Sequence, residues 1–379
     1  RNGGSIMDWP ALRAAEFPVT ERWAFLDHGG VSPLPARTAR VLADYADEIS
    51  RNGSAGLKIW AERTEETRRR LARLLNCDAL DLALVKNTGE GLVIVAEGYP
   101  WRDGENVVVA SEEYPSNQYP WMNLHHRGVG VKHVPSRGNR IAVDDLAAAI
   151  DGRTRVLALS FVEFASGYRN DLAAIGQLCR DRGVHFCVDA IQGLGVLPLD
   201  LARLPIDFLA TGAHKWLLGP QGAGALYIRR ELLDRLHPVG VGAHSVREPF
   251  NYDRIKFDLK PHAGRYEGGT LNFAGFAAWG ASLALLKEIG PAEVEARVKS
   301  LANHLCERAR AAGIDVFSSR AQDEWSGIVS LAVPDATGLA KKCRAAGIVV
   351  AARGGRLRAC PHVYNTEDDL DRLMEVVCH

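Results

Sequence analysis

Short apolar segments separated by amphipathic helical patterns constrain the fold of this chain more than any other feature. Four of these segments are residues 105–110, 155–162, 184–190 and 207–213. They are rich in Val, Leu and Phe and do not alternate with polar residues, which is typical of strands covered on both faces. Amphipathic patterns at 144–152 and 171–183 lie between them. This order predicts an α/β fold with a mainly parallel sheet.

The sequence pattern changes at about residue 275. Long helical patterns and short strand-like segments follow, and a final helix begins near Thr366, where Asp369 completes a capping box. The predicted divisions are a tag remnant with a start Met (1–7), an N-terminal segment that packs on the smaller domain (8–30), a large domain (31–270) and a smaller α+β domain (271–379).

Composition argues against several classes of partner. The 46 basic and 46 acidic residues cancel, whereas nucleic acids and membrane surfaces attract proteins with a basic field. No run of about 18 apolar residues is present, so we expect no membrane-spanning segment. The seven cysteines form no C-x-x-C pair, which favours reduced thiols in a cytoplasmic protein. His125 and His126 lack the spacing of metal ligands, so no metal site is predicted.

The turn "VKNTGEG" at residues 85–91 follows an apolar segment and begins a helical pattern. Thr88, Gly89 and Glu90 are expected at the N-terminus of that helix, where free N–H groups and the helix dipole favour a phosphate. Considered alone, the turn is better explained as ordinary helix capping.

Polar residues also lie at the ends of two of the apolar segments. Asp189 ends one segment, with Gln192 three residues later, and the other segment ends in a stretch that contains Thr211, His214 and Lys215. A buried carboxylate needs a positive partner. A partly desolvated lysine has a lowered pKa, which suits Schiff-base chemistry. Taken singly, an N-cap role explains Asp189 and a surface loop explains Lys215.

The phosphate turn, the acid and the lysine together form one constellation. All three follow predicted strands, and ligands of open parallel sheets bind beyond the carboxyl ends of the strands. Pyridoxal 5′-phosphate (PLP) uses all three, because it carries a phosphate, a ring nitrogen that a carboxylate keeps protonated, and an aldehyde that reacts with a lysine. The sequence therefore predicts PLP as the cofactor.

Several motifs resemble those of a known family. They are "EEYPSNQYPW", "VDAIQGLG", "HKWLLGPQGAGALY", "RYEGGTLN" and "RACPHVYNT". In these motifs the chain is similar to the class V aminotransferase family of PLP-dependent enzymes, from "AFLDHGGVSPLP" to "VYNTEDDLDRL". The resemblance implies fold type I, with a mainly parallel seven-stranded sheet in the large domain.

The resemblance also implies roles for individual residues around the cofactor. Lys215 matches the lysine that forms the Schiff base, and Asp189 matches the acid at the pyridine nitrogen. Gln192 matches a group near the ring hydroxyl, and Tyr114 lies where the family stacks a ring on PLP. The remaining cofactor contacts that the resemblance implies are Thr88, Gly89, Glu90, Thr211 and His214.

Further matches concern the substrate and the oligomer. Arg358 matches the arginine that binds the substrate carboxylate, and Arg353 and Arg356 are close rivals for that role. His28, Gly29 and Asn117 are the other expected substrate contacts. Thr270 matches a threonine that reaches the phosphate of the neighbouring subunit, which implies a homodimer.

Two departures from the family pattern bear on the reaction. Cysteine desulfurases carry a loop cysteine shortly before the carboxylate arginine, but "GIVVAARGGRLRAC" is short and has no cysteine before Arg358. Cys360 follows the arginine and is expected in the core, which argues against persulfide-forming desulfuration. Phe164 occupies a position where some relatives have an asparagine near the hydroxyl of the cofactor ring. Here we expect Gln192 alone to tune that hydroxyl.

Several functions stay open on this sequence. The resemblance implies an enzyme that acts at the α-carbon of an amino acid, either an aminotransferase or a β-eliminating C–S lyase, with an epimerase as the alternative. A non-catalytic PLP-binding regulatory protein is an alternative of another class. A nucleotide-binding enzyme that uses the 85–91 turn is disfavoured, since no lysine-serine pair follows.

Overall fold

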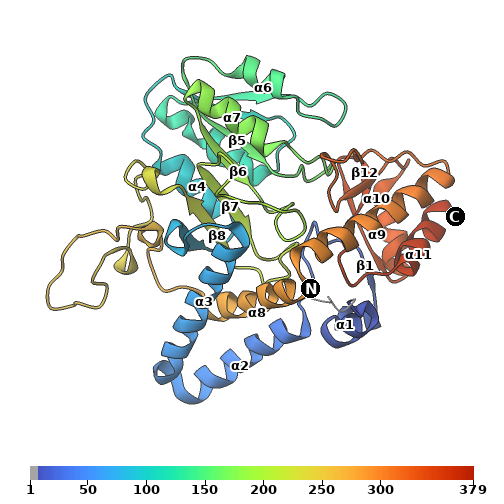
Figure 1. Cartoon of the computed structure of the whole chain (residues 1–379), viewed down its shortest axis with the longest axis horizontal. Helices are drawn as coiled ribbons and strands as arrows, with labels where there is room; N and C mark the ends of the chain where they lie inside the picture. Colours follow the sequence, from blue (N-terminus) through green and yellow to red (C-terminus); the bar gives the residue numbers. More distant parts are fainter. Residues whose placement is uncertain (1–6) are drawn as a thin grey trace, which may run out of the picture.

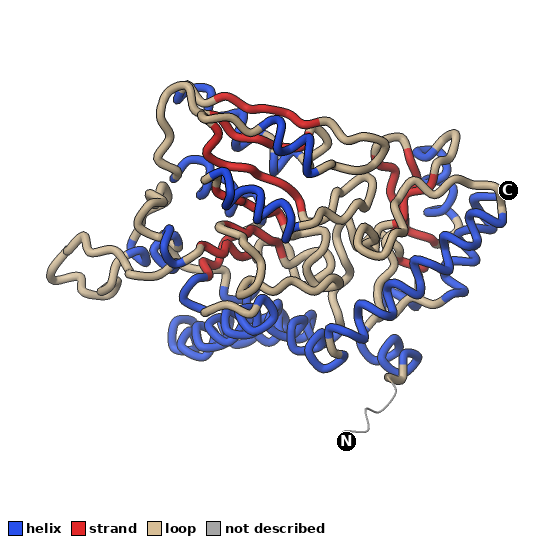
Figure 2. Tube along the Cα trace, turned by 45° about the horizontal axis from the view of Figure 1, so that its top comes forward, coloured by secondary structure: helices blue, strands red, loops and turns tan. Residues whose placement is uncertain are grey.

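In the computed structural model, which describes residues 7–379, the central element is a seven-stranded sheet (Figures 1 and 2). In spatial order its strands are β2 (Leu82–Val85), β8 (Gly224–Ile228), β7 (Phe208–Gly212), β6 (His185–Asp189), β5 (Thr154–Ser160), β3 (Asn106–Ala110) and β4 (Gly130–Val134). Strand β8 runs antiparallel to β2 and β7, and the other neighbouring pairs of this sheet are parallel. The predicted mainly parallel sheet is confirmed, and the four predicted strands are β3, β5, β6 and β7.

Alternate residues of the central strands face different helices. In β3, Val107 and Val109 belong to an apolar cluster with α4 (Thr88–Gly98) and α5 (Tyr119–Asn123). Val108 and Ala110 belong to the cluster on the opposite face. That face is covered by α3 (Leu57–Leu75), α6 (Val143–Ala149), α7 (Leu172–Arg182) and α8 (Phe273–Ile289). The strands are apolar throughout because both faces are covered.

A second group of elements lies around the C-terminus, at the right of Figure 1. Its antiparallel sheet has the order β11 (Ala351–Arg353), β12 (Arg356–Ala359) and β9 (Val329–Leu331). The helices of this group are α9 (Pro291–Ala311), α10 (Ala336–Ala345) and α11 (Glu367–Cys378). The predicted capping box of Thr366 and Asp369 at the start of α11 is confirmed.

The N-terminal residues lie beside this C-terminal group. After α1 (Trp9–Glu16), strand β1 (Ala24–Phe25) pairs in parallel with β10 (Ile348–Val349). Helix α2 (Ala36–Asn52) then leads away along α8 (Figure 1). The predicted domain boundaries stay predictions, and residues 1–6 of the predicted tag remnant lie outside the described residues.

The segment 239–262 projects away from the sheet and is drawn in tan at the left of Figure 1. Its apolar side chains are unusually exposed, with Tyr252 at 75% and Ile255 at 88% of full exposure. Isolated exposed apolar residues are ordinary, but a run of them on a projecting segment is typical of a contact surface. Among the described residues, none of the helices has the length and apolar character needed to cross a membrane.

Candidate active site

The predicted functional residues converge where the strands of the large sheet end. Thr88 follows β2, Tyr114 follows β3, Asp189 ends β6 and Lys215 follows β7. They line one pocket of about 300 Å³. Nine predicted residues line it: Gly29, Thr88, Gly89, Tyr114, Asp189, Gln192, His214, Lys215 and Arg358. The convergence follows from parallel strand direction, because carboxyl ends of such strands share one edge.

Lys215 is held by a strained turn. The backbone N–H of Leu218 donates to the Lys215 carbonyl at 3.0 Å, and Leu218 has a left-handed φ of 56°. A bulky non-glycine residue rarely adopts this conformation without support from its surroundings. Ser282 of α8 supplies support, since its hydroxyl donates to the Leu218 carbonyl at 2.8 Å. The turn fixes the backbone from which the lysine side chain enters the pocket.

Burial makes the Lys215 amine unusually acidic. The side chain is buried, and desolvation lowers its pKa from the ordinary 10.5 to about 8. The negative charge of Asp189 opposes this shift, whereas the positive charge of Arg358 adds to it. An amine with a pKa of about 8 is partly neutral near neutral pH, as a nucleophile or general base requires.

Asp189 is the buried carboxylate opposite this amine. Burial raises its pKa to about 6, and a hydrogen bond at 3.0 Å from the backbone N–H of Ile191 and the charge of Lys215 oppose the rise. A buried carboxylate with one backbone donor has capacity for a further positive partner. A protonated pyridine nitrogen fits that requirement.

Thr88 and Gly89 form a cradle at the N-terminus of α4. The buried Thr88 hydroxyl has no hydrogen-bond partner within residues 7–379. A Cβ added at Gly89 would lie only 3.3 Å from Oδ1 of Asn87 and 3.6 Å from Oγ of Ser116. The first turn of the helix thus offers free N–H groups, a dipole and an unused hydroxyl, which fit a phosphate.

Aromatic rings form another wall of the pocket. Tyr114 is 43% exposed, and its ring meets that of Phe164 edge-on, with 5.2 Å between the ring centres. Nζ of Lys215 lies 5.4 Å from the centre of the Tyr114 ring. An exposed ring beside the amine can stack on a flat ligand that the amine holds.

Gln192 and His214 support the pocket as neutral groups. The Gln192 amide donates to the Gly29 carbonyl at 2.9 Å and accepts from the indole N–H of Trp216 at 3.0 Å. It therefore ties the N-terminal segment to the residue after Lys215. Burial, and secondarily the charge of Lys215, lower the pKa of His214 to about 4, so its imidazole is neutral at physiological pH.

Arg358 enters the pocket from β12 with part of its guanidinium already engaged. It is 1% exposed, and it pairs with Asp27 at 2.9 Å and donates to the Phe164 carbonyl at 2.8 Å. Its Nε is buried without a partner in the described chain. A Cβ at Gly29 would lie 3.1 Å from the guanidinium carbon, so only glycine leaves room beside it.

Two of the expected substrate contacts, His28 and Asn117, lie outside this lining. His28 is fully buried, and its ring nitrogens bond to the Cys360 carbonyl and the Tyr364 hydroxyl, both at 2.8 Å. Asn117 accepts from the indole N–H of Trp121 at 2.9 Å. Both side chains hold elements of the fold in place behind the pocket.

Three of the expected cofactor contacts also lie outside the lining. Glu90 binds the backbone N–H and the amine of Lys86. Thr211 is buried within β7, and its hydroxyl has only a 3.5 Å contact to the Gly212 carbonyl. Thr270 lines a different cavity beside Gly268 and Gly269. The structure thus does not bring these three to Lys215 within one chain.

Sequence reasoning missed two polar residues of the lining, Asn87 and Ser116. Both fall inside stretches that had been singled out, since Asn87 precedes Thr88 and Ser116 follows Tyr114 by two positions. Both could have been predicted from their positions, because each lies next to a predicted site residue on a turn that follows a strand. Arg353, considered only as a rival of Arg358, also lines the pocket.

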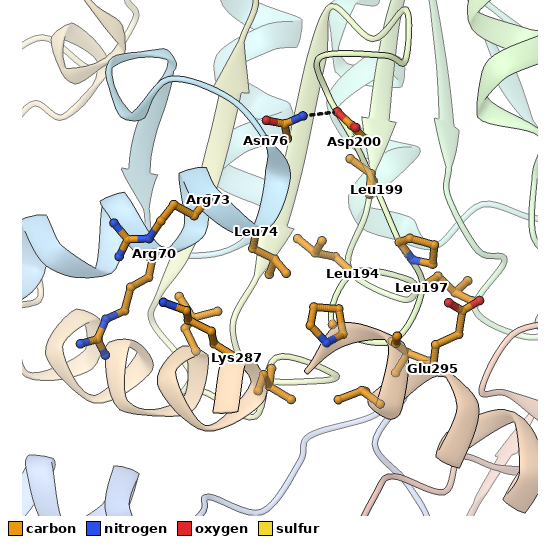
Figure 3. A pocket seen from close by; sticks show the side chains of 18 residues that line it. Arg70, Arg73, Leu74, Asn76, Leu194, Leu197, Leu199, Asp200, Lys287 and Glu295 are labelled. Atoms are coloured by element: carbon orange, nitrogen blue, oxygen red, sulfur yellow. Dashed lines mark hydrogen bonds between the residues drawn. The ribbon is translucent and has the colours of Figure 1, made fainter. Parts of the chain in front are cut away.

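A second large cavity lies away from these residues, between α3, the 194–200 turn and the junction of α8 and α9 (Figure 3). It measures about 530 Å³, and Leu74, Leu194 and Leu197 point into it. Its lining includes none of the predicted site residues. Within residues 7–379, no group of three or more His, Cys, Asp or Glu side chains is arranged to hold a metal ion.

The chain is similar in sequence and in fold to known proteins. A family model described as Aminotransferase class-V matches residues 24–373. A probable cysteine desulfurase of Methanothermobacter thermautotrophicus is 29% identical over 96% of each chain. The uncharacterized aminotransferase YcbU of Bacillus subtilis is 26% identical over 95% of each chain. The solved structure of the cysteine desulfurase CsdA from Escherichia coli matches with a TM-score of 0.87 at 26% identity, over 98% of each chain.

Proposed function

This chain belongs to the class V aminotransferase family, and we propose that it acts at the α-carbon of an amino acid. The family is PLP-dependent, so the predicted cofactor and fold type are confirmed. The observation that carries the proposal is that Lys215, Asp189 and Arg358 line one pocket beside the Thr88 cradle. The cradle, the acid and the amine fit the phosphate, the ring nitrogen and the aldehyde of PLP.

We assign the proton transfer to Lys215. When bound, PLP supplies an electron sink for the pair that remains when a bond at Cα breaks. The Lys215 amine, with its pKa lowered to about 8, accepts the Cα proton when neutral and returns it when charged. Asp189 keeps a negative charge at the ring nitrogen, and Thr88, Gly89 and His214 hold the phosphate end.

Arg358 is the proposed anchor of the substrate carboxylate. The guanidinium is fixed by Asp27 and by the Phe164 carbonyl before a ligand arrives, so little ordering is needed when a carboxylate binds. Gly29 leaves the space beside it. Tyr114 would stack on the cofactor ring, and the Gln192 side chain would lie near the hydroxyl of that ring.

The reaction that follows proton removal is proposed to be β-elimination of a C–S bond. The names of the Methanothermobacter relative and of the Escherichia coli structure, both cysteine desulfurases, support it. Transamination is the second candidate, supported by the aminotransferase name of the Bacillus relative. Epimerisation is the remaining alternative.

We propose that this chain does not carry sulfur as a persulfide. Within residues 7–379, no cysteine lines the pocket. Cys360 is fully buried, and burial raises the pKa of its thiol to about 11, which leaves it protonated and unreactive. Mass spectrometry after incubation with L-cysteine is expected to find no protein persulfide, and a persulfide on any cysteine would refute this part.

A homodimer with shared sites is proposed as the active unit. The exposed apolar side chains on 239–262 support a contact with a second copy. Thr270 lines a cavity next to this segment rather than its own Lys215 pocket. In a mixed dimer of one Lys215→Ala chain and one Thr270→Ala chain, one of the two sites contains both intact residues. Such dimers should therefore be active at one site, whereas dimers of either variant alone stay inactive. Monomers in light scattering would refute the proposal.

A cytoplasmic location is also proposed. All seven cysteines are free thiols in the described part of the chain, as expected where disulfides are kept reduced. Fractionation of cells that express the native protein tests this assignment.

One titration tests the proposed reaction. L-Amino acids are added singly to the PLP-loaded protein while its visible absorbance and products are followed. A lyase releases ammonia and a 2-oxo acid continuously, together with the β-substituent. An aminotransferase forms one 2-oxo acid per site and continues only when a second 2-oxo acid is added. An epimerase changes only the configuration at Cα. A protein whose absorbance responds to no amino acid would contradict the proposal.

A further inference from the structure

We propose that Arg353 selects substrates whose side chain ends in a second negative group. The inference rests on the proposed function and names the class of amino acid that the site prefers. The class comprises acidic amino acids with a short side chain that carries a carboxylate or a sulfinate.

Arg353 lies on a hairpin that gathers three cations on one face. Strands β11 and β12 pair so that Arg353 is opposite Arg356, and Arg358 is two positions further along β12. Residues opposite each other in an antiparallel pair, and residues two apart in a strand, share a face. The turn consists of Gly354 and Gly355, with φ of 54° and 74°, as a tight two-residue hairpin requires.

The three arginines of this face have different surroundings. Arg358 is paired with Asp27. Arg356 lies over the ring of Phe317, with its guanidinium carbon 3.6 Å from the ring centre, and it lines a neighbouring cavity. Arg353 lines the Lys215 pocket, and its guanidinium donates to the adjacent Ala352 carbonyl. In the described part of the chain, no carboxylate lies within ion-pair distance of Arg353.

The charges of the pocket favour a substrate that carries a second anion for Arg353. Lys215, Arg353 and Arg358 bring three positive groups, and Asp189 is the one carboxylate among the described residues of the lining. The cofactor phosphate is accounted for at Thr88 and the substrate α-carboxylate at Arg358. Two cations directly opposite in a hairpin destabilise each other, and a second anion from the substrate offsets that repulsion.

The size of the pocket limits the length of this side chain. A volume of about 300 Å³ is at the low end for ligand sites, and it has to contain the cofactor ring as well as the substrate. A short side chain such as that of aspartate or cysteine sulfinate fits this limit. Because Arg353 is exposed on the rim, its substitution leaves the buried framework intact.

The test compares two unreactive ligands on the PLP-loaded protein. Succinate and butyrate differ in one terminal carboxylate, and their binding is followed by the change in cofactor absorbance and by thermal shift. We expect succinate to bind about tenfold more tightly, because the added ion pair is partly exposed. Arg353→Met should remove this preference. Arg356→Met is the matched control, since it removes a charge from the same hairpin face outside the Lys215 pocket and should keep the preference.

Kinetics separate failure of this inference from failure of the proposed function. The ratio of kcat/KM for cysteine sulfinate over L-cysteine should fall about tenfold in Arg353→Met and stay at its original value in Arg356→Met. Equal binding of succinate and butyrate, or a preference that survives in Arg353→Met, overturns the role of Arg353. Turnover of neutral amino acids in that case leaves the proposed function standing. A protein that turns over no amino acid overturns both.

Discussion

The Lys215 amine should react with PLP at a pH at which an ordinary lysine is almost fully protonated. Burial lowers its pKa from 10.5 to about 8. At pH 7.5 the neutral fraction of an amine with a pKa of 8 is roughly 200-fold larger than that of an amine with a pKa of 10.5. The rate of cofactor loading into the apoprotein should therefore rise with pH and level off just above pH 8.

Two substitutions should move this midpoint in opposite directions. The negative charge of Asp189 raises the pKa of Lys215, so Asp189→Asn should lower the midpoint. The positive charge of Arg358 lowers that pKa, so Arg358→Gln should raise it. The opposite signs distinguish electrostatic control from a general loosening of the pocket, which would move both midpoints toward 10.5.

The assay mixes apoprotein with excess PLP and follows the visible absorbance by stopped flow between pH 6 and pH 10. Rates are divided by the rate constant of a free lysine derivative per neutral amine at the same pH, which removes the titration of PLP but keeps that of Lys215. Lys215→Ala is the control for reaction at other amines. A midpoint near 10.5 in the unaltered protein, or equal shifts in both variants, would refute the reasoning from burial and charge.

Three further predictions follow from groups around the site and the C-terminal elements. Thr88→Val should weaken PLP binding about tenfold in equilibrium dialysis, because the hydroxyl that the phosphate would use is lost, and Thr88→Ser should bind normally; equal affinities would remove Thr88 from the cradle. Thr366→Ala should lower the free energy of unfolding by about 1 kcal/mol in urea, because α11 loses its cap, while Thr366→Ser keeps most of it. Burial lowers the pKa of His362 from 6.5 to about 4, so the unfolded chain binds the proton more readily. The free energy of unfolding should therefore fall by up to about 3 kcal/mol as pH drops from 6.5 toward 4. His362→Gln should flatten that slope, and an unchanged slope would exclude this histidine.

The central strands could be predicted because their physical signal is local. The residues of β3, β5, β6 and β7 are buried on both faces, so each reads as an unbroken apolar run. β4 was not predicted, because it is an edge strand whose Lys132 and His133 interrupt the pattern. The antiparallel β8 was not predicted either, because a glycine-rich turn directly precedes it and obscures where the strand begins.

The residues of the pocket could be predicted to the extent that strand direction determines them. Thr88, Asp189 and Lys215 each follow strands of one direction, so a single rule brings them together. The same rule could not predict the place of His28, because its hydrogen-bond partners Cys360 and Tyr364 are more than 300 positions away in the sequence. No local pattern reveals whether a side chain at such a junction faces the pocket or the core.

The reactivity of Lys215 depends on segments from both ends of the chain. Arg358 of β12 contributes to the lowered pKa of the amine, and Asp27 holds its guanidinium. His362 contacts the residue after the lysine: its Nδ1 accepts from the backbone N–H of Val363 at 2.8 Å, so its Nε2–H donates to the Trp216 carbonyl at 3.1 Å. This bonding requires a neutral imidazole with the proton on Nε2. Protonation of His362 therefore opposes the packing that desolvates Lys215, and the loss of stability in acid should be accompanied by a loss of the low pKa of the amine.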